Sequence, residues 1–209
     1  MIHDKSIIQY FLFDLGGVLY EINPRKLVNE FISHFKTKDV NNIASTQDIL
    51  QMDIFIDYEL GNITTDEFRN EASRIFGFEL SNIEFDKLWN SMLIKPYQDV
   101  LNFTSGISKQ MNVCLLSNTN EIHFNHFYPI CEKYFKNFTQ QFYSYRLGLR
   151  KPQHKIFHYV MKNLNAQPEQ ILFIDDTESN IVSAADLGIQ TFHFDYRTNR
   201  SDLLNNFPY

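Results

Sequence analysis

Four short apolar runs, each followed by polar residues, constrain the fold of this chain more than any other feature. The runs are Tyr10–Phe13, Val113–Leu116, Gln141–Tyr145 and Ile171–Ile174. Continuous apolar runs of this length, separated by helical patterns, are typical of a parallel sheet that helices cover on both faces. A fifth run, Gln190–Phe194, could add another strand. The pattern predicts an α/β fold with a doubly wound, mainly parallel sheet.

The polar residues that follow the first four runs are expected to meet. They are Asp14, Ser117-Asn118, Arg150-Lys151 and Asp175-Asp176. In open α/β sheets, ligands bind beyond the carboxyl ends of the strands. The order of the runs therefore predicts one shared site at that edge.

A long helical stretch lies between the first and second runs. Apolar residues recur there at three- and four-residue spacing over Pro24–Phe35, Gln47–Tyr58, Thr65–Phe76 and Phe85–Asn90, with no strand signal. We predict a helical subdomain over residues 23–92 that covers the site, and a core formed by residues 1–22 and 93–209. The prolines in Asn23-Pro24 and Lys95-Pro96 suit hinges. Further helices are expected over Asp99–Gln110, Pro152–Leu164 and Ser179–Leu187.

Composition limits the class of protein. The 209 residues include 44% hydrophobic residues and carry a formal net charge of −6, which excludes wholesale disorder and disfavours nucleic-acid binding. Cys114 and Cys131 lack metal-site and redox-motif spacing and fit a reducing compartment. No run could span a bilayer, and Met1–Gln9 lacks the features of a secretory signal. We expect a cytoplasmic monomer or homodimer that binds neither nucleic acid nor membranes.

Each polar cluster alone has an ordinary structural explanation as a strand end, a turn or a helix cap. Together the clusters fit the cleavage of a phosphate ester. A carboxylate can attack the phosphoryl group, and a divalent cation must then offset the repulsion between the two anions. Mg²⁺ prefers oxygen ligands, which Asp14, the Gly16 carbonyl, Asp175 and Asp176 could supply. The other phosphate oxygens could be bound by Ser117, backbone amides near Asn118 and Gly17, and the Lys151 ammonium.

The sequence resembles the haloacid dehalogenase-like (HAD) hydrolase superfamily. Its four motifs match Phe13–Leu19, Leu116–Asn120, Arg150–Pro152 and Ile174–Asn180, and the helical insert is similar to a C1-type cap on a Rossmann-like core. Within the superfamily, the Ser-Asn-Thr-Asn stretch and the segment Leu147–Pro152 look closest to the bacterial α-D-glucose-1-phosphate phosphatase group.

The resemblance implies a role for each matched residue. It makes Asp14 the nucleophile of a Mg²⁺-dependent phosphomonoester hydrolase that forms an aspartyl-phosphate and acts on a small phosphorylated metabolite, such as a sugar 1-phosphate. It assigns Ser117, Asn118 and Lys151 to phosphate, and Asp176, with Asp175 beside it, to the metal. These paired acids weigh against a dehalogenase, because that branch does not require Mg²⁺.

One position departs from the family pattern. Gly16 stands where most phosphatases of the family carry a second aspartate as general acid and base, a role worth about 10²–10⁴-fold in rate. Three hypotheses follow: the substrate has a good leaving group, a different residue supplies the proton (Glu21, Glu59 or His123), or the protein is a catalytically weak or silent phosphometabolite-binding protein.

Several other residues have two interpretations. His154 and His158 have the spacing of a zinc pair but lack an evident third ligand, so two exposed histidines are expected. Trp89 is expected to anchor the insert. Tyr20 and Arg25 follow the nucleophile loop and could contact the substrate.

Overall fold

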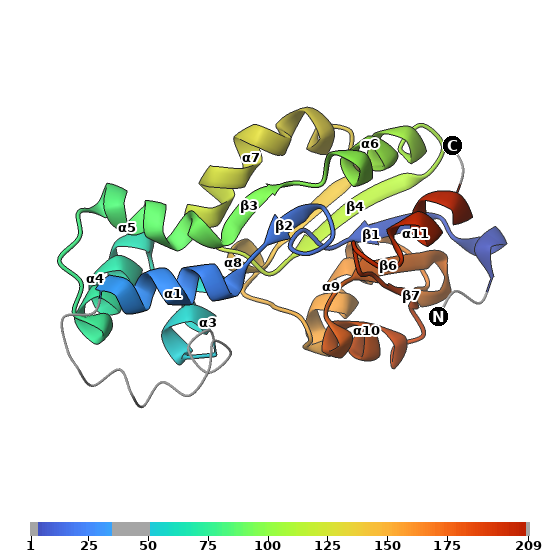
Figure 1. Cartoon of the computed structure of the whole chain (residues 1–209). Helices are drawn as coiled ribbons and strands as arrows, with labels where there is room; N and C mark the ends of the chain where they lie inside the picture. The colour runs from blue at the N-terminus through green and yellow to red at the C-terminus, as the bar shows by residue number, and fades with distance from the viewer. Residues whose placement is uncertain (1–3, 35–50, 208–209) are drawn as a thin grey trace.

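A five-stranded parallel sheet forms the centre of the molecule. The computed structural model describes residues 4–34 and 51–207. The strands lie in the order β5-β4-β1-β6-β7, and every neighbouring pair is parallel (Figure 1). They span β1 Tyr10–Phe13, β4 Asn112–Ser117, β5 Gln140–Tyr143, β6 Ile171–Asp175 and β7 Gln190–His193. The predicted mainly parallel sheet, including its fifth strand, is confirmed.

Helices cover both faces of this sheet because successive residues of the central strand point to opposite faces. Phe11 and Phe13 pack in one cluster with residues of α6 (Gln98–Ile107), α7 (Glu121–Phe135) and α11 (Arg200–Asn206). Leu12 packs in a second cluster with residues of α9 (His154–Leu164) and α10 (Glu178–Ala185). Both faces of β1 are thus buried, which explains why its sequence is continuously apolar.

The insert has an aromatic core of its own. The described residues of the insert form α1 (Pro24–His34), α3 (Asp53–Glu59), α4 (Thr65–Phe76), α5 (Asn82–Trp89) and the short helix η3 (Asn90–Met92). The α4 and α5 helices both begin with a capping box, at Thr64 and Ser81. Phe31, Phe55, Phe68, Phe85 and Trp89 are all buried in one cluster. The expected anchoring role of Trp89 agrees with its place there.

A pair of antiparallel strands connects the insert to the core. β2 (Tyr20–Ile22) pairs with β3 (Leu93–Pro96). The prediction of no strand signal between the first two apolar runs was wrong for both β2 and β3, because short strands that pair only with each other need no long apolar run. The division into an insert at 23–92 and a core at 1–22 and 93–209 stays a prediction, supported by the position of this pair.

Several helices and strands begin or end at residues other than those that the sequence predicts. The α7 helix was not predicted, and the predicted start at Pro152 was wrong, since α9 begins at His154. The run predicted over Gln141–Tyr145 ends as a strand at Tyr143, because the short helix α8 (Ser144–Leu147) follows directly. Two 3₁₀ turns, η1 (Lys5–Ile7) and η4 (Pro168–Gln170), precede strands. Residues 35–50, which include the start of the helix predicted over Gln47–Tyr58, lie outside the described residues.

The two cysteines and the helix lengths agree with the sequence analysis. Cys114 and Cys131 are free and buried, as expected for packed side chains. Within residues 4–34 and 51–207, none of the helices has the length and apolar character needed to cross a bilayer. A cytoplasmic location stays a prediction.

A closed ring of hydrogen bonds joins the end of the insert to the core. The Trp89 indole N–H donates to Asn120 Oδ1 (3.2 Å), the Asn120 amide donates to His123 Nδ1 (3.2 Å), and His123 Nε2 donates to the Trp89 carbonyl (3.2 Å). The Trp89 carbonyl can only accept, so Nε2 carries a proton, and the Asn120 amide nitrogen can only donate, so Nδ1 carries none. This imidazole is therefore neutral. The Trp89 and His123 rings also stack, with centroids 5.1 Å apart. Burial lowers the pKa of His123 to about 4.

The buried His123 is predicted to make stability fall in mild acid. The unfolded chain takes up a proton on this imidazole below about pH 6.5, whereas the folded chain resists it until about pH 4. The contribution of the neutral His123 to the free energy of unfolding is therefore fully present above pH 6.5 and is lost as the pH falls towards 4. Relative to His123→Gln, the wild-type free energy of unfolding should decline by about 3 kcal/mol over this range. Urea denaturation across a pH series measures it.

Exposed His154 offers the matched control for this experiment. His154→Gln should leave the pH dependence of stability close to that of the wild type. Parallel curves for the wild type and His123→Gln would contradict the neutral, buried state of His123.

Candidate active site

Three carboxylates and one lysine meet at the carboxyl edge of the sheet. In the registered strands, Phe13 lies beside Ile174, so Asp14 follows β1 at the level of Asp175. One carboxylate oxygen from each of Asp14, Asp175 and Asp176 lies within 4.8 Å of the others. The predicted convergence of strand-end side chains is therefore observed for these three residues.

The Lys151 ammonium lies between two of these carboxylates. Its Nζ is 2.7 Å from Asp14 Oδ1 and 2.6 Å from Asp175 Oδ2. Only 2% of Lys151 is exposed, and Asp14 and Asp175 are buried as well. Burial disfavours the charged ammonium, but the contacts with Asp14 and Asp175 outweigh it and raise the pKa of Lys151. The lysine is thus held as a cation against the nucleophile candidate.

Hydrogen bonds hold both the backbone and the side-chain ammonium of Lys151 in place. The Asn118 side chain donates to the Lys151 carbonyl and accepts from its amide, both at 2.9 Å. Asp175, which holds the ammonium, accepts from the Thr177 amide (2.8 Å) and from the Asn180 side chain (3.1 Å to each carboxylate oxygen). Asn180 is the member of this group whose role the sequence did not reveal, although it lies within the fourth motif.

The backbone at Gly17, in the first motif, lies very close to the Asp176 carboxylate of the fourth motif. Gly17 has φ +75°, a left-handed conformation that favours glycine. A Cβ on Gly17 would lie 2.0 Å from Asp176 Oδ2. The backbone of the first motif therefore reaches the Asp176 carboxylate only because this residue has no side chain.

The carboxylate cluster carries more negative charge than the lysine balances. Burial raises the pKa of Asp14 to about 8, with Lys151 opposing the shift and Asp175 and Asp176 adding to it. Burial and the charge of Asp175 likewise raise the pKa of Asp176 to about 6. Three oxygen donors with an excess of negative charge are the chemistry that a hard divalent cation prefers. The residues present therefore fit Mg²⁺.

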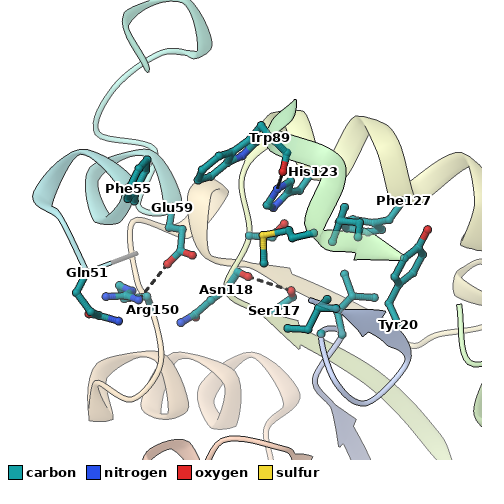
Figure 2. A pocket seen from close by; sticks show the side chains of 16 residues that line it. Tyr20, Gln51, Phe55, Glu59, Trp89, Ser117, Asn118, His123, Phe127 and Arg150 are labelled. Atoms are coloured by element: carbon teal, nitrogen blue, oxygen red, sulfur yellow. Dashed lines mark hydrogen bonds and ion pairs between the residues drawn. The ribbon is translucent and has the colours of Figure 1, made fainter. Parts of the chain in front are cut away.

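A pocket of about 240 Å³ opens between the core and the insert (Figure 2). Its lining includes Leu15, Gly16 and Arg150, which adjoin Asp14 and Lys151 in the sequence, whereas the side chains of the charged cluster do not line it. The core contributes polar groups that include Ser117 and Asn118, next to Gly16. Apolar side chains form much of the remaining wall: Leu15, Tyr20, Ile22, Phe55, Trp89, Met92, Leu93 and Phe127. Such a mixture of an apolar wall with a few polar groups at one end is typical of a small-molecule site.

An ion pair between the insert and the core forms another part of the wall. Glu59 at the end of α3 lies 3.0 Å from the Arg150 guanidinium, measured from Oε2 to Nη2 (Figure 2). Burial raises the pKa of Glu59, and the Arg150 charge opposes this shift.

The three residues proposed as substitutes for the missing aspartate differ in position. Glu59 lines the pocket, as does His123. However, both ring nitrogens of His123 are engaged and its pKa is lowered to about 4, so at neutral pH the ring is neutral and its one N–H is already donated to the Trp89 carbonyl. It therefore lacks the acidic proton that a general acid needs. Glu21 pairs with Lys95 at 3.8 Å and lines a separate surface groove.

The structure also gives the positions of the other residues that the sequence analysis singled out. Tyr20 lines the pocket, whereas Arg25 is exposed and does not line it. His154 and His158 are exposed, as expected. Within the described part of the chain, the only cluster of acidic, histidine or cysteine side chains close enough to share a metal is that of Asp14, Asp175 and Asp176. The zinc interpretation therefore has no support.

Comparison with curated proteins finds phosphatases. The chain is 30% identical to D-ribitol-5-phosphate phosphatase from Bacteroides thetaiotaomicron over 96% of its own length and 100% of that protein. It is 24% identical to a sesquiterpene phosphatase from Aspergillus oryzae, over 87% of both chains. The assignment to the glucose-1-phosphate phosphatase group stays a prediction.

Comparison with solved structures agrees with the observed fold. A HAD family enzyme from B. thetaiotaomicron, crystallised with magnesium and inorganic phosphate, superposes with a TM-score of 0.82 at 31% identity, covering 94% of this chain and 99% of the other. A HAD-like hydrolase from Porphyromonas gingivalis gives a TM-score of 0.81 at 26% identity, covering 94% and 96%. The model of the haloacid dehalogenase-like hydrolase family matches residues 8–188. The chain therefore belongs to the haloacid dehalogenase-like hydrolases and is an enzyme of that family.

Proposed function

We propose that the protein is a Mg²⁺-dependent phosphomonoester hydrolase that acts on a small phosphorylated metabolite. The observation that carries this proposal is the buried Lys151 ammonium, in contact with both Asp14 and Asp175 beside a pocket. The 30% identity to D-ribitol-5-phosphate phosphatase supports the same reaction class. The oligomeric state, a monomer or a homodimer, stays a prediction.

In this proposal Asp14 is the nucleophile. A carboxylate oxygen of Asp14 attacks phosphorus, the bond between phosphorus and the leaving oxygen breaks, and that oxygen takes a proton from solvent. Water then attacks the phosphorus of the aspartyl-phosphate, which releases inorganic phosphate and restores the Asp14 carboxylate. Ser117, Asn118, Lys151 and the Gly17 amide bind the phosphoryl oxygens throughout.

The metal would be held by Asp14, Asp176, Asp175 and the Gly16 carbonyl. Bound Mg²⁺ supplies positive charge that offsets the repulsion between the carboxylates and the phosphoryl group. Asp175 already accepts hydrogen bonds from Lys151, Thr177 and Asn180, so it also orients the lysine. The small pocket favours a leaving group of a few carbon atoms, and a sugar 1-phosphate stays one candidate.

Replacing the nucleophile tests this function directly. Asp14→Asn should lower Mg²⁺-dependent hydrolysis of p-nitrophenyl phosphate by at least about 10³-fold, because an amide is a far weaker nucleophile. Release of p-nitrophenol with and without Mg²⁺ measures the loss. Asp186→Asn, at an exposed position outside the pocket, is the control and should retain activity. A fully active Asp14→Asn variant would exclude the proposed chemistry.

The contact between Gly17 and Asp176 predicts an effect on metal binding. In Gly17→Ala the new methyl group must displace the Asp176 carboxylate, so the Mg²⁺ concentration for half-maximal thermal stabilisation should rise by about tenfold or more. Gly77→Ala is the matched control, because Gly77 has φ +70° but no atom within 4 Å of a new Cβ. Equal Mg²⁺ dependence in the two variants would refute the assignment of Asp176 to the metal.

The glycine at position 16 predicts strong dependence on the leaving group. Without a positioned proton donor there, kcat/KM for aryl phosphates of similar size should fall as the leaving-group pKa rises. Gly16→Asp should flatten this dependence, and the substitution has room, because a Cβ would meet only the end of the flexible Ile22 side chain at 3.1 Å. Gly16→Asn is the control. A wild-type rate that is insensitive to the leaving group would count against this explanation.

The competing hypothesis is a catalytically silent phosphometabolite-binding protein. It would bind phosphate esters but show no Mg²⁺-dependent turnover in any of these assays.

A further inference from the structure

A short loop after β4 carries groups that bind the phosphoryl oxygens in the proposed function. β4 ends at Ser117 and α7 begins at Glu121, so the loop consists of residues 118–120. Ser117 and Asn118 line the pocket (Figure 2). Their hydroxyl and amide groups can bind a phosphoryl oxygen only if the loop keeps one conformation, and this conformation depends on what holds its backbone.

Both ends of the loop are held by regular structure. Ser117 is the last residue of β4 in the parallel sheet. At the other end, Asn120 caps α7, because its side chain accepts from the His123 amide (3.0 Å) and from the Trp89 indole N–H (3.2 Å). The backbone of Thr119 lies between these fixed ends and belongs to neither element.

The hydroxyl of Ser144 holds the Thr119 backbone on both sides. It accepts a hydrogen bond from the Thr119 amide (2.9 Å) and donates one to the Thr119 carbonyl (3.0 Å). In the part of the chain that the structure describes, these two groups have no other hydrogen-bond partner. The amide belongs to the peptide unit shared with Asn118, and the carbonyl belongs to the unit shared with Asn120. One hydroxyl therefore fixes two successive peptide units of the loop.

The fold supports Ser144 itself firmly. Tyr143, the last residue of β5, lies beside Ser117 in the register of the parallel strands, so Ser144 follows at the level of the loop. Ser144 begins the short helix α8, and its carbonyl accepts from the Gly148 amide (2.9 Å). Ser144 is 0% exposed and Thr119 is 3% exposed, so solvent does not reach these hydrogen bonds readily.

We propose that Ser144 is a positioning residue, which holds the loop in the conformation in which Ser117 and Asn118 bind the phosphoryl group. Ser144 does not line the pocket, so it acts through Thr119 and not on the substrate. Without the hydroxyl, the Thr119 amide and carbonyl would be buried and unpaired, and the loop would shift to pair them elsewhere. This inference rests on the proposed phosphatase function and adds a residue that lies outside the four motifs.

Removal of this hydroxyl tests the proposal. In Ser144→Ala, kcat/KM for p-nitrophenyl phosphate at saturating Mg²⁺ should fall by about 10-fold or more, because two backbone groups lose their partner. The inhibition constant of inorganic phosphate should rise by a similar factor. The Mg²⁺ concentration for half-maximal activity should stay unchanged, since Asp14, Asp175 and Asp176 lie at the ends of β1 and β6. A loss of stability alone would lower the melting temperature without this division between phosphate and metal.

Two comparisons separate the hydroxyl from the fit of the side chain. Ser144→Thr keeps the hydroxyl and should retain higher kcat/KM than Ser144→Val, which has nearly the same shape without it. Thr104→Val is the matched control for the loss of a buried hydroxyl. Thr104 in α6 is also 0% exposed and donates to the Leu101 carbonyl (2.8 Å), but it does not line the pocket. This variant should keep the wild-type kcat/KM and phosphate inhibition constant.

Hydrogen exchange tests the same contact in the wild-type protein, without any variant. If the loop must open for the Thr119 amide to exchange, and an open loop cannot bind phosphate, then bound phosphate should slow this exchange. With Mg²⁺ and inorganic phosphate at ten times its dissociation constant, the rate should fall by about 10-fold. An unchanged exchange rate would overturn the proposal.

The remaining outcomes are also distinct. Wild-type values of kcat/KM and the phosphate inhibition constant in Ser144→Ala, or equal losses in Ser144→Thr and Ser144→Val, would overturn the positioning role and leave the phosphatase function intact. If the wild type neither hydrolyses p-nitrophenyl phosphate with Mg²⁺ nor binds inorganic phosphate, the proposed function fails, and this inference fails with it.

Discussion

The placement of one buried ammonium between two carboxylates is the interaction on which the site depends. Lys151 can remain charged at 2% exposure only because Asp14 and Asp175 lie within 2.7 Å of its Nζ. Both acids follow or end neighbouring parallel strands, so the register of β1 and β6 sets their separation. The regular sheet thereby fixes the position of the Asp14 carboxylate more firmly than loops alone could.

Much of the core could be predicted from sequence, because strands buried on both faces must be continuously apolar. The same rule located Asp14, Ser117 and Asp175 at strand ends. The short β2 and β3 strands escaped prediction, since their pairing depends on residues that are distant in sequence. Asn180 escaped for a related reason: its hydrogen bonds to Asp175 depend on how α10 packs against β6. Contacts made only after folding leave no local pattern.

Core and insert each contribute part of the pocket wall. The similar proteins include a phosphatase named for D-ribitol 5-phosphate and another named for a sesquiterpene. In this chain, Ser117 and Asn118 at the end of a core strand line one part of the pocket, whereas insert residues such as Phe55 and Glu59 line another. Under the proposed function, phosphoryl transfer would use residues of the core, whereas the leaving group would also contact residues of the insert.

The pairing of β2 with β3 has a consequence for how such proteins diversify. Both crossings between core and insert run side by side, so the chain leaves the sheet and returns to it at nearly the same point. An exchange of everything between Ile22 and Leu93 would therefore keep the ends of the break together. Evolution or protein engineering could therefore replace the insert at the β2–β3 pair without moving the strands that carry Asp14 and Asp175.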